Sequence, residues 1–106
     1  MQEINVTEAA RRLSEDPDNT LLLDVREDME LSIAKIAGAL HIPMGEIPAR
    51  LAELDANKTI ICMCHHGGRS AQVAAFLNSE GFTQAPNLAG GIDAWSEQVD
   101  ASIPRY

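Results

Sequence analysis

The sequence predicts an α/β fold with a central, mostly parallel sheet of about five short strands and helices on both faces. Residues 21–25 and 59–64 are largely apolar and do not alternate between apolar and polar residues. This pattern is typical of strands that are covered on both faces of a sheet. Segments with helical spacing of apolar residues alternate with the strand segments, and this alternation is typical of parallel pairing. No repeat or low-complexity tract interrupts the pattern, so residues 1–106 are expected to form a single domain.

The expected strands are short and are separated by helices or turns. They lie at residues 4–6, 21–25, 38–42, 59–64 and 84–88. Thr7 can cap the first helix, which ends before the turn at residues 16–19. Residues 27–33 can form a second short helix. Pro43 ends the third strand, because proline cannot donate a hydrogen bond to a neighbouring strand.

Three further helices are expected after residue 46. Apolar residues at helical spacing predict one over residues 47–54, with Pro48 suited to its first turn. Residues 70–80 are expected to form another, and Gly81 stands where a left-handed helix cap belongs. The glycine pair at residues 90–91 precedes the last short helix.

Composition limits the partners of this chain. Its formal net charge is -8, with 16 Asp and Glu against 8 Lys and Arg. An acidic surface repels phosphate backbones, so nucleic acid is not expected as a partner, and an anionic substrate would need a local group of donors. No apolar stretch approaches the roughly 20 residues of a membrane span, and no signal peptide is visible, so neither membrane binding nor export is expected.

The two cysteines, Cys62 and Cys64, are separated by one residue and would close almost no loop as a disulfide. Reduced thiols and a cytoplasmic location are therefore expected. Cys62 lies on the same side of its strand as Cys64 and is expected in the core. Cys64 lies at the carboxyl end of the strand, where ligands bind to parallel sheets.

The candidate site is the segment that joins this strand to the next helix, Cys64-His65-His66-Gly67-Gly68-Arg69-Ser70. Its two glycines allow successive amides to point inward, and the helix N-terminus adds partial positive charge. A thiolate would be stabilised there, with a pKa lowered from about 8.5 to between roughly 3.5 and 7.5. The histidines and the arginine add further donors.

Two reactions fit a nucleophilic sulfur in a ring of donors: sulfur transfer through a persulfide, and phosphoester cleavage through a phosphocysteine. Four residues separate Cys64 from Arg69, one fewer than separate the cysteine and arginine of cysteine-based phosphatases. Ser70 stands where the phosphatase arginine would be. The shorter ring suits a single added sulfur atom better than a tetrahedral phosphate.

Five stretches of the chain, taken together, resemble one known family. They are residues 22–27 (Leu-Leu-Asp-Val-Arg-Glu), 38–43, 64–70, 87–95 and 103–106. In this order they are similar to the rhodanese-like domains, and especially to the small single-domain bacterial sulfurtransferases. The resemblance implies a three-layer fold, a persulfide on Cys64, and a loop from Cys64 to Arg69 whose amides cradle it. It also implies that Asp24 and Arg26 brace the site from a neighbouring strand.

The activity implied by this resemblance is that of a thiosulfate sulfurtransferase. Cys64 would take the outer sulfur of thiosulfate or of a persulfide donor and pass it to a thiol or protein acceptor, with no cofactor. The residues that would bind the substrate are His65, His66, Gly67, Gly68, Arg69 and Ser70. A persulfide relay or binding module for a partner protein is the alternative, and a small phosphatase or arsenate reductase is a more distant one.

Structural roles remain open for the charged residues of the candidate site. Arg69 can bind an incoming anion, or it can pair with Asp93 or another surface acid. Arg26 can pair with Glu30, four residues further along.

The histidines also have two interpretations. His65 and His66 can line the pocket or can be polar loop residues without a role. Together with Cys62 and Cys64 they are spaced too closely to surround a metal ion tetrahedrally, so no metal site is expected.

Overall fold

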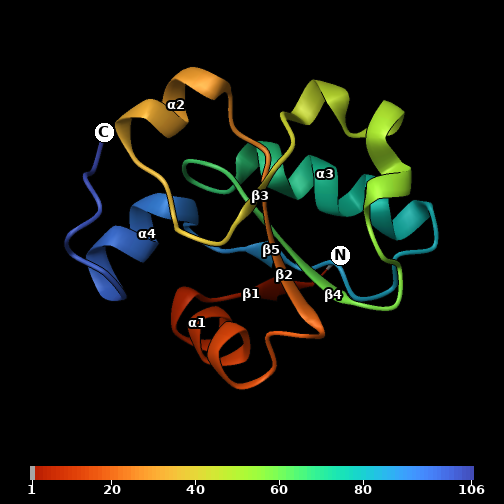
Figure 1. The fold of residues 1–106 in the computed structure, drawn as a ribbon, viewed down its shortest axis with the longest axis horizontal. Coiled ribbons are helices and arrows are strands. Elements are labelled where there is room, and N and C mark those ends of the chain that lie inside the picture. The colour runs from red at the N-terminus through yellow and green to blue at the C-terminus, as the bar shows by residue number, and fades with distance from the viewer. Residues whose placement is uncertain (1) are drawn as a thin grey trace.

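A five-stranded parallel sheet lies at the centre of the fold, in the order β1-β5-β4-β2-β3 (Figure 1). The computed structural model describes residues 2–106. Its strands are β1 (Glu3–Ile4), β2 (Thr20–Asp24), β3 (Leu40–His41), β4 (Thr59–Met63) and β5 (Asn87–Leu88). The strand pairs that join them are all parallel, so the α/β fold class expected from the sequence is confirmed.

Helices cover both faces of this sheet. They are α1 (Val6–Glu15), α2 (Asp28–Ile33), α3 (Gly68–Ser79) and α4 (Gly91–Gln98), with the 3-10 segments η1 (Met44–Glu46) and η2 (Pro48–Glu53). α1 and α4 pack on one face and α3 on the other, while α2 lies beside the C-terminus (Figure 1). Within residues 2–106, every helix is too short or too polar to cross a bilayer.

The side chains of β4 alternate between two hydrophobic cores. Ile60, Cys62 and then Cys64 pack into the core beneath α3. Ile61 and Met63 pack into the core beneath α1 and α4. All five are at most 1% exposed, so this strand is buried on both faces. The structure thus places Cys62 in the core and Cys64 on the same face, where the strand ends.

The start of α1 differs from the expectation. β1 ends at Ile4, and Asn5 rather than Thr7 caps the helix, because its side-chain oxygen accepts a hydrogen bond from the amide of Glu8 at 2.8 Å. Pairing of β1 with β5 ends at Ile4 and leaves Asn5 free to cap the helix, and asparagine is a better cap than threonine, so the helix starts earlier. Thr7 lies inside the first turn.

Other expected elements are shorter or more tightly wound. β3 and β5 have two residues each. The helix expected over residues 47–54 is the 3-10 segment η2, with Pro48 at its start. The backbone dihedrals of Arg50, φ -113° and ψ 16°, are not helical, and the segment is kinked at this residue. Gly81 follows α3 with a φ of 94°, as expected for a left-handed cap.

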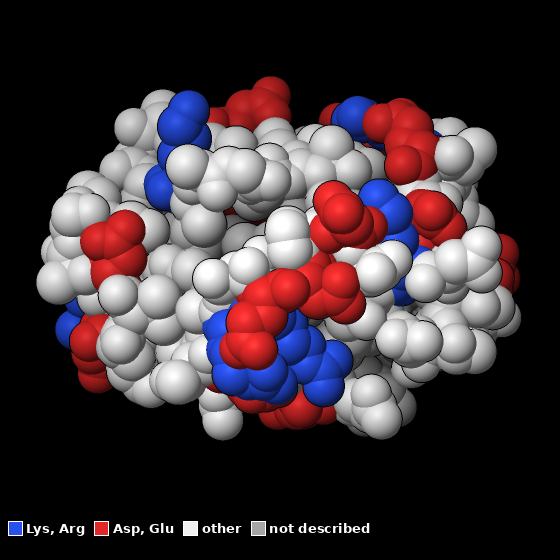
Figure 2. Space-filling view, turned by 60° about the horizontal axis from the view of Figure 1, so that its bottom comes forward, with Lys and Arg blue, Asp and Glu red and all other residues white. Residues whose placement is uncertain are grey.

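The arginine side chains on the surface are paired with acids. Figure 2 shows one face of the molecule, on which Lys and Arg side chains lie mostly beside Asp and Glu side chains. On α1, Arg11 bonds Glu8 and Glu15, and on η2, Arg50 bonds Glu53. Exposed pairs of this kind contribute little to stability, because water and salt screen them. They neutralise much of the positive charge, so the surface remains acidic.

Candidate active site

Cys64 lies at the carboxyl edge of the sheet, between β4 and α3. A loop was expected over residues 65–70, but α3 already begins at Gly68, so Arg69 and Ser70 belong to its first turn. This difference matters for the chemistry, because the amides of a first helical turn have no partner within the helix and can bind an anion. The Cys64 side chain lies against this turn and is almost fully buried.

Four donors surround the Cys64 sulfur. The amide of Gly67 donates to Sγ at 3.1 Å, and the Ser70 hydroxyl lies 3.2 Å from it. The amides of Arg69 and Ser70, in the same helical turn, also favour the charged form of the sulfur. Burial alone would raise the pKa of this thiol, but the Ser70 hydroxyl and the three nearby amides together outweigh burial and lower the pKa. This cradle favours a thiolate and has the chemistry to hold a second anionic sulfur.

Cys62 has the opposite environment. Its thiol is buried in the core beneath α3, and the carbonyl oxygen of Ile60 lies 3.8 Å from its sulfur. Burial raises the pKa of Cys62 to about 12. Of the two cysteines, Cys64 alone is therefore suited to act as a nucleophile near neutral pH.

Asn87 ties the Cys64 loop to β5, although nothing in the sequence pattern singled it out. Its buried amide donates to the carbonyl of Gly67 at 3.1 Å and to the carboxylate of Glu3 at 2.7 Å. Its oxygen accepts a hydrogen bond from the Ser70 hydroxyl at 2.6 Å. The single hydroxyl proton therefore has two acceptors, and ionisation of Cys64 draws it to the sulfur, because a charged acceptor forms the stronger bond.

Replacing Ser70 by alanine is expected to shift the pH dependence of Cys64 alkylation to higher pH, because it removes a donor to the thiolate. A hydrogen bond to a charged group is worth about 1.5–3 kcal/mol, so the alkylation rate at neutral pH should fall by about tenfold to a hundredfold. The rate with iodoacetamide as a function of pH, in a Cys62→Ala background, measures this shift. Ser96→Ala is the control, since it removes a buried hydroxyl that bonds the Ile92 carbonyl on α4. Identical profiles for the two serine variants would contradict the assignment.

The N-terminus of α4 closes the other side of the loop. The amide of Ile92 donates to the carbonyl of Cys64 at 2.9 Å, and the amide of Asp93 donates to that of His65 at 3.1 Å. Gly91 approaches so closely that a Cβ on it would lie 2.5 Å from the Cys64 carbonyl oxygen. Its φ of 59° is also left-handed. Glycine is required here for both reasons.

Gly91→Ala is expected to displace the loop and to lower the free energy of unfolding by about 2–4 kcal/mol, as the sum of backbone strain and overpacking. Gly38→Ala is a matched control, because Gly38 has a φ of 87° but nothing within 4 Å of its Cβ position. Urea unfolding of both variants measures the difference. Equal losses of stability would show that the close approach to the loop is unimportant.

Asp24 and Arg26 form a buried ion pair at the end of β2, the strand beside β4. The Arg26 guanidinium donates to the Asp24 carboxylate through Nη2 at 2.8 Å and Nε at 3.0 Å. It also donates to the carbonyl of Ala34 at 2.8 Å and to the hydroxyl of Tyr106 at 2.9 Å. Arg26 reaches the backbone carbonyl of Glu30, at 3.5 Å, rather than its carboxylate. The pair thus joins the sheet to the segment after α2 and to the C-terminal residues.

Arg69 extends from the first turn of α3 toward α2. Asp93 or another acid was one expected partner, and the structure shows that the partner is Glu30. Nη1 and Nη2 of Arg69 donate to the two carboxylate oxygens of Glu30 at 2.6 and 2.9 Å. Asp93 instead accepts hydrogen bonds from Arg105, at 3.0 and 3.1 Å. Tyr106 donates its hydroxyl proton to Glu30 at 2.6 Å. The sequence did not single out Glu30 or Tyr106 as site residues, because no local motif connects them to the loop.

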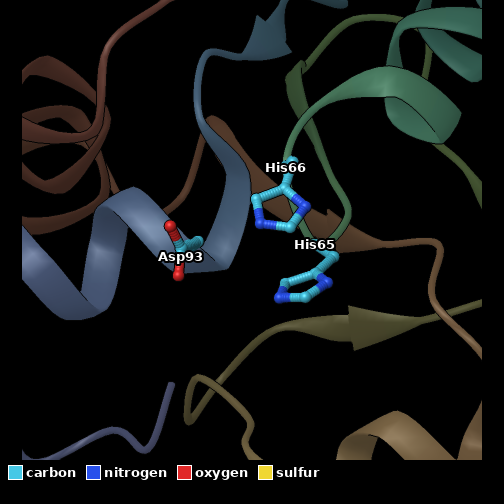
Figure 3. Close-up of side chains that lie close together, drawn as sticks. All are labelled: His65, His66 and Asp93. Carbon is cyan, nitrogen blue, oxygen red and sulfur yellow. The ribbon is translucent and has the colours of Figure 1, made fainter. Parts of the chain in front are cut away.

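The two histidines form an aromatic stack with Tyr106. The ring centroids of His65 and His66 are 3.8 Å apart, and Tyr106 stacks on the other side of His65 at the same distance. With Asp93, the histidines place three potential metal-ligating atoms within 4.8 Å of one another (Figure 3). The nitrogen lone pairs of stacked rings lie in neighbouring planes and do not converge on one point, as metal coordination requires. Both carboxylate oxygens of Asp93 already accept hydrogen bonds from Arg105. The expectation that no metal binds stays a prediction.

Comparison with known proteins identifies the family. Residues 5–98 match the family described as Rhodanese-like domain. A protein named sulfurtransferase from Allochromatium vinosum is 35% identical over 96 residues, which cover 91% of this chain and 89% of that protein. The Rhodanese-like/PpiC domain-containing protein 12 of Arabidopsis thaliana is 38% identical over 113 residues, but this chain spans only 38% of its length.

The fold comparison agrees with the sequence comparison. The crystal structure of a rhodanese-like domain protein from Staphylococcus aureus matches this structure with a TM-score of 0.84 at 32% identity. The match covers 100% of this chain and 99% of that one. The parallel sheet, the loop that follows β4 and the match over residues 5–98 lead to one conclusion: the chain belongs to the rhodanese-like domain family.

Proposed function

We propose that this protein is a sulfurtransferase that carries a sulfane sulfur as a persulfide on Cys64. The observation that supports the proposal most directly is the cradle of three amides and one hydroxyl around a thiol of lowered pKa. Similarity to a protein named sulfurtransferase supports transferase activity in general. Both cysteines are free, and this chemistry needs a free thiol, so a reducing compartment such as the cytoplasm would suit it.

The reaction has two steps. The Cys64 thiolate attacks the outer sulfur of the donor, and the donor bond to that sulfur breaks. The leaving group departs with the electron pair, as sulfite from thiosulfate or as a thiolate from a persulfide donor. An acceptor thiol, free or on a protein, then attacks the outer sulfur of the Cys64 persulfide and restores the thiolate. No cofactor takes part.

The surroundings of Cys64 favour a persulfide over a phosphocysteine. The sulfur is almost fully buried, and Gly67, Arg69 and Ser70 already place donors against it. Such a tight enclosure suits one added atom, whereas a phosphoryl group would bring three further oxygens. Arg69 lies against Glu30 and is not free to clamp phosphate oxygens.

The proposal is tested by the intact mass of the protein after incubation with thiosulfate or, separately, with cysteamine persulfide. We expect at least one donor to add the mass of one sulfur atom, and cyanide to remove it as thiocyanate. No gain with either donor, or a gain that resists cyanide, would contradict a persulfide intermediate. A gain with the persulfide donor alone would favour a relay between thiol carriers.

A further inference from the structure

The sulfur donor that this site accepts depends on the charges that surround Cys64. We infer that Glu30 is a specificity residue that disfavours thiosulfate and favours persulfide donors with neutral or cationic groups beside the sulfur. This inference rests on the proposed persulfide chemistry of Cys64 and names the donor class for it.

Glu30 neutralises the one arginine of the Cys64 loop. Both terminal nitrogens of Arg69 face the two carboxylate oxygens in a bidentate pair, with distances of 2.6 and 2.9 Å. Paired in this way, the guanidinium presents little net charge to an approaching anion and offers it fewer donors. An anion that used Arg69 would first have to displace the carboxylate.

The Glu30 carboxylate is itself held firmly. Besides the two bonds from Arg69, it accepts the Tyr106 hydroxyl at 2.6 Å and the amide of Glu27 at 3.1 Å. The Arg69 hydrogen bonds are the main cause that lowers the pKa of Glu30 to about 2, against a smaller opposing effect of burial. The carboxylate therefore stays ionised at every pH at which a sulfurtransferase would work, and its charge is a fixed part of the site.

The other arginines near the site are also paired. Arg26 is bound to Asp24 beneath the loop, and Arg105 is bound to Asp93 beside the two stacked histidines. The positive potential available to a substrate thus comes mainly from the amides and the N-terminus of α3, which lie against the sulfur. With a net charge of -8 on the chain, this positive region is small.

The charge of the sulfur donor determines how strongly the acidic groups around Cys64 repel it. Thiosulfate arrives as a dianion and leaves as the sulfite dianion, so both of its charges must lie beside the thiolate and Glu30. A thiol persulfide without an anionic group beside its sulfur arrives neutral or singly charged and leaves as a thiolate. The same sulfur atom is transferred in both cases, but the second reaction meets much less repulsion.

A comparison of three sulfur donors separates the effect of donor charge from the effect of donor reactivity. Thiosulfate is compared with two thiol persulfides of similar length, that of 3-mercaptopropionate, which carries a carboxylate, and that of cysteamine, which carries an ammonium group. We expect Glu30→Gln to raise the second-order rate constant of persulfide formation at least tenfold for the two anionic donors, because one full charge is removed beside the site. With cysteamine persulfide we expect a change below about threefold, because its net charge is small.

The control variant is Glu53→Gln, which removes the acid of another bidentate pair, with Arg50 on η2. We expect it to leave the donor preference unchanged. Glu30→Asp keeps the charge beside the loop and should shift the donor preference much less than Glu30→Gln does, so this variant tests the role of charge if Glu30→Gln folds poorly.

Two results would overturn the inference. They are an equal effect of Glu30→Gln on all three donors, as a purely structural role would produce, and a change of preference in Glu30→Asp as large as the tenfold change expected for Glu30→Gln. Failure of the proposed function looks different, because wild-type protein would then form no Cys64 persulfide with any of the donors.

Discussion

Replacing Cys64 by serine is expected to abolish persulfide formation and to lower the rate of sulfur transfer by at least about a thousandfold, to the level of the uncatalysed reaction. A serine hydroxyl is not ionised near neutral pH, even among the donors that lower the pKa of Cys64, and it forms no persulfide. Intact mass after incubation with a donor measures the loss directly. Thiocyanate release in the presence of cyanide measures the loss of turnover.

Cys62→Ala is the matched control for this variant. Burial raises the pKa of Cys62 to about 12, and its side chain lies in the core beneath α3, so removing it should cost some stability but leave the persulfide yield intact. A mass gain that persists in Cys64→Ser would show that another residue carries the sulfur. A loss of yield in folded Cys62→Ala protein would show that the two thiols act together.

Arg26→Met is expected to cause the largest loss of stability of any single substitution considered for this protein. Methionine approximates the length of arginine but leaves the Asp24 carboxylate buried without its partner, and breaking such a pair costs about 3–5 kcal/mol. The hydrogen bonds from Arg26 to Ala34 and Tyr106 are lost as well. Urea unfolding at neutral pH, with the slope compared between variants, measures the change.

The double variant Asp24→Asn, Arg26→Met separates the buried charge from packing. Asparagine removes the unpaired carboxylate but keeps the side-chain oxygen that accepts the amide of residue 26, at 3.1 Å in the wild-type protein. We expect it to recover a large part of the stability lost in Arg26→Met, because the charge is the costly element. If Arg26→Met lies within about 1 kcal/mol of wild type, the ion pair is not a major support of the fold. Arg26→Lys keeps the charge and gives a measurable intermediate if Arg26→Met does not fold.

Elements with a strong, uniform pattern were predicted well from sequence. β2 and β4 are buried on both faces, and their largely apolar sequences left few alternatives. The position of Cys64 at a strand end followed from the boundary of β4. Gly81 was also predicted correctly, because a left-handed cap strongly favours glycine.

Local boundaries were predicted less well. Asn5 and Thr7 are both acceptable helix caps, and the choice between them depends on where β1 stops pairing with β5. The segment around Pro48 has helical spacing, but the pattern does not distinguish an α-helix from the 3-10 winding of η2. α3 begins at Gly68 rather than at Ser70, and this shift brings the amides of Arg69 and Ser70 to the sulfur.

The sequence by itself determined the α/β class, the candidate nucleophile and the loop that carries it, because periodicity, glycine placement and motif spacing are local properties of a chain. Only the tertiary structure decided what surrounds that loop. Glu30 meets Arg69 across 39 positions and Tyr106 across 76, and these pairings depend on where α2, α3 and the C-terminal residues come to lie. Side-chain pairing between elements is set by their packing in space, which no local pattern encodes.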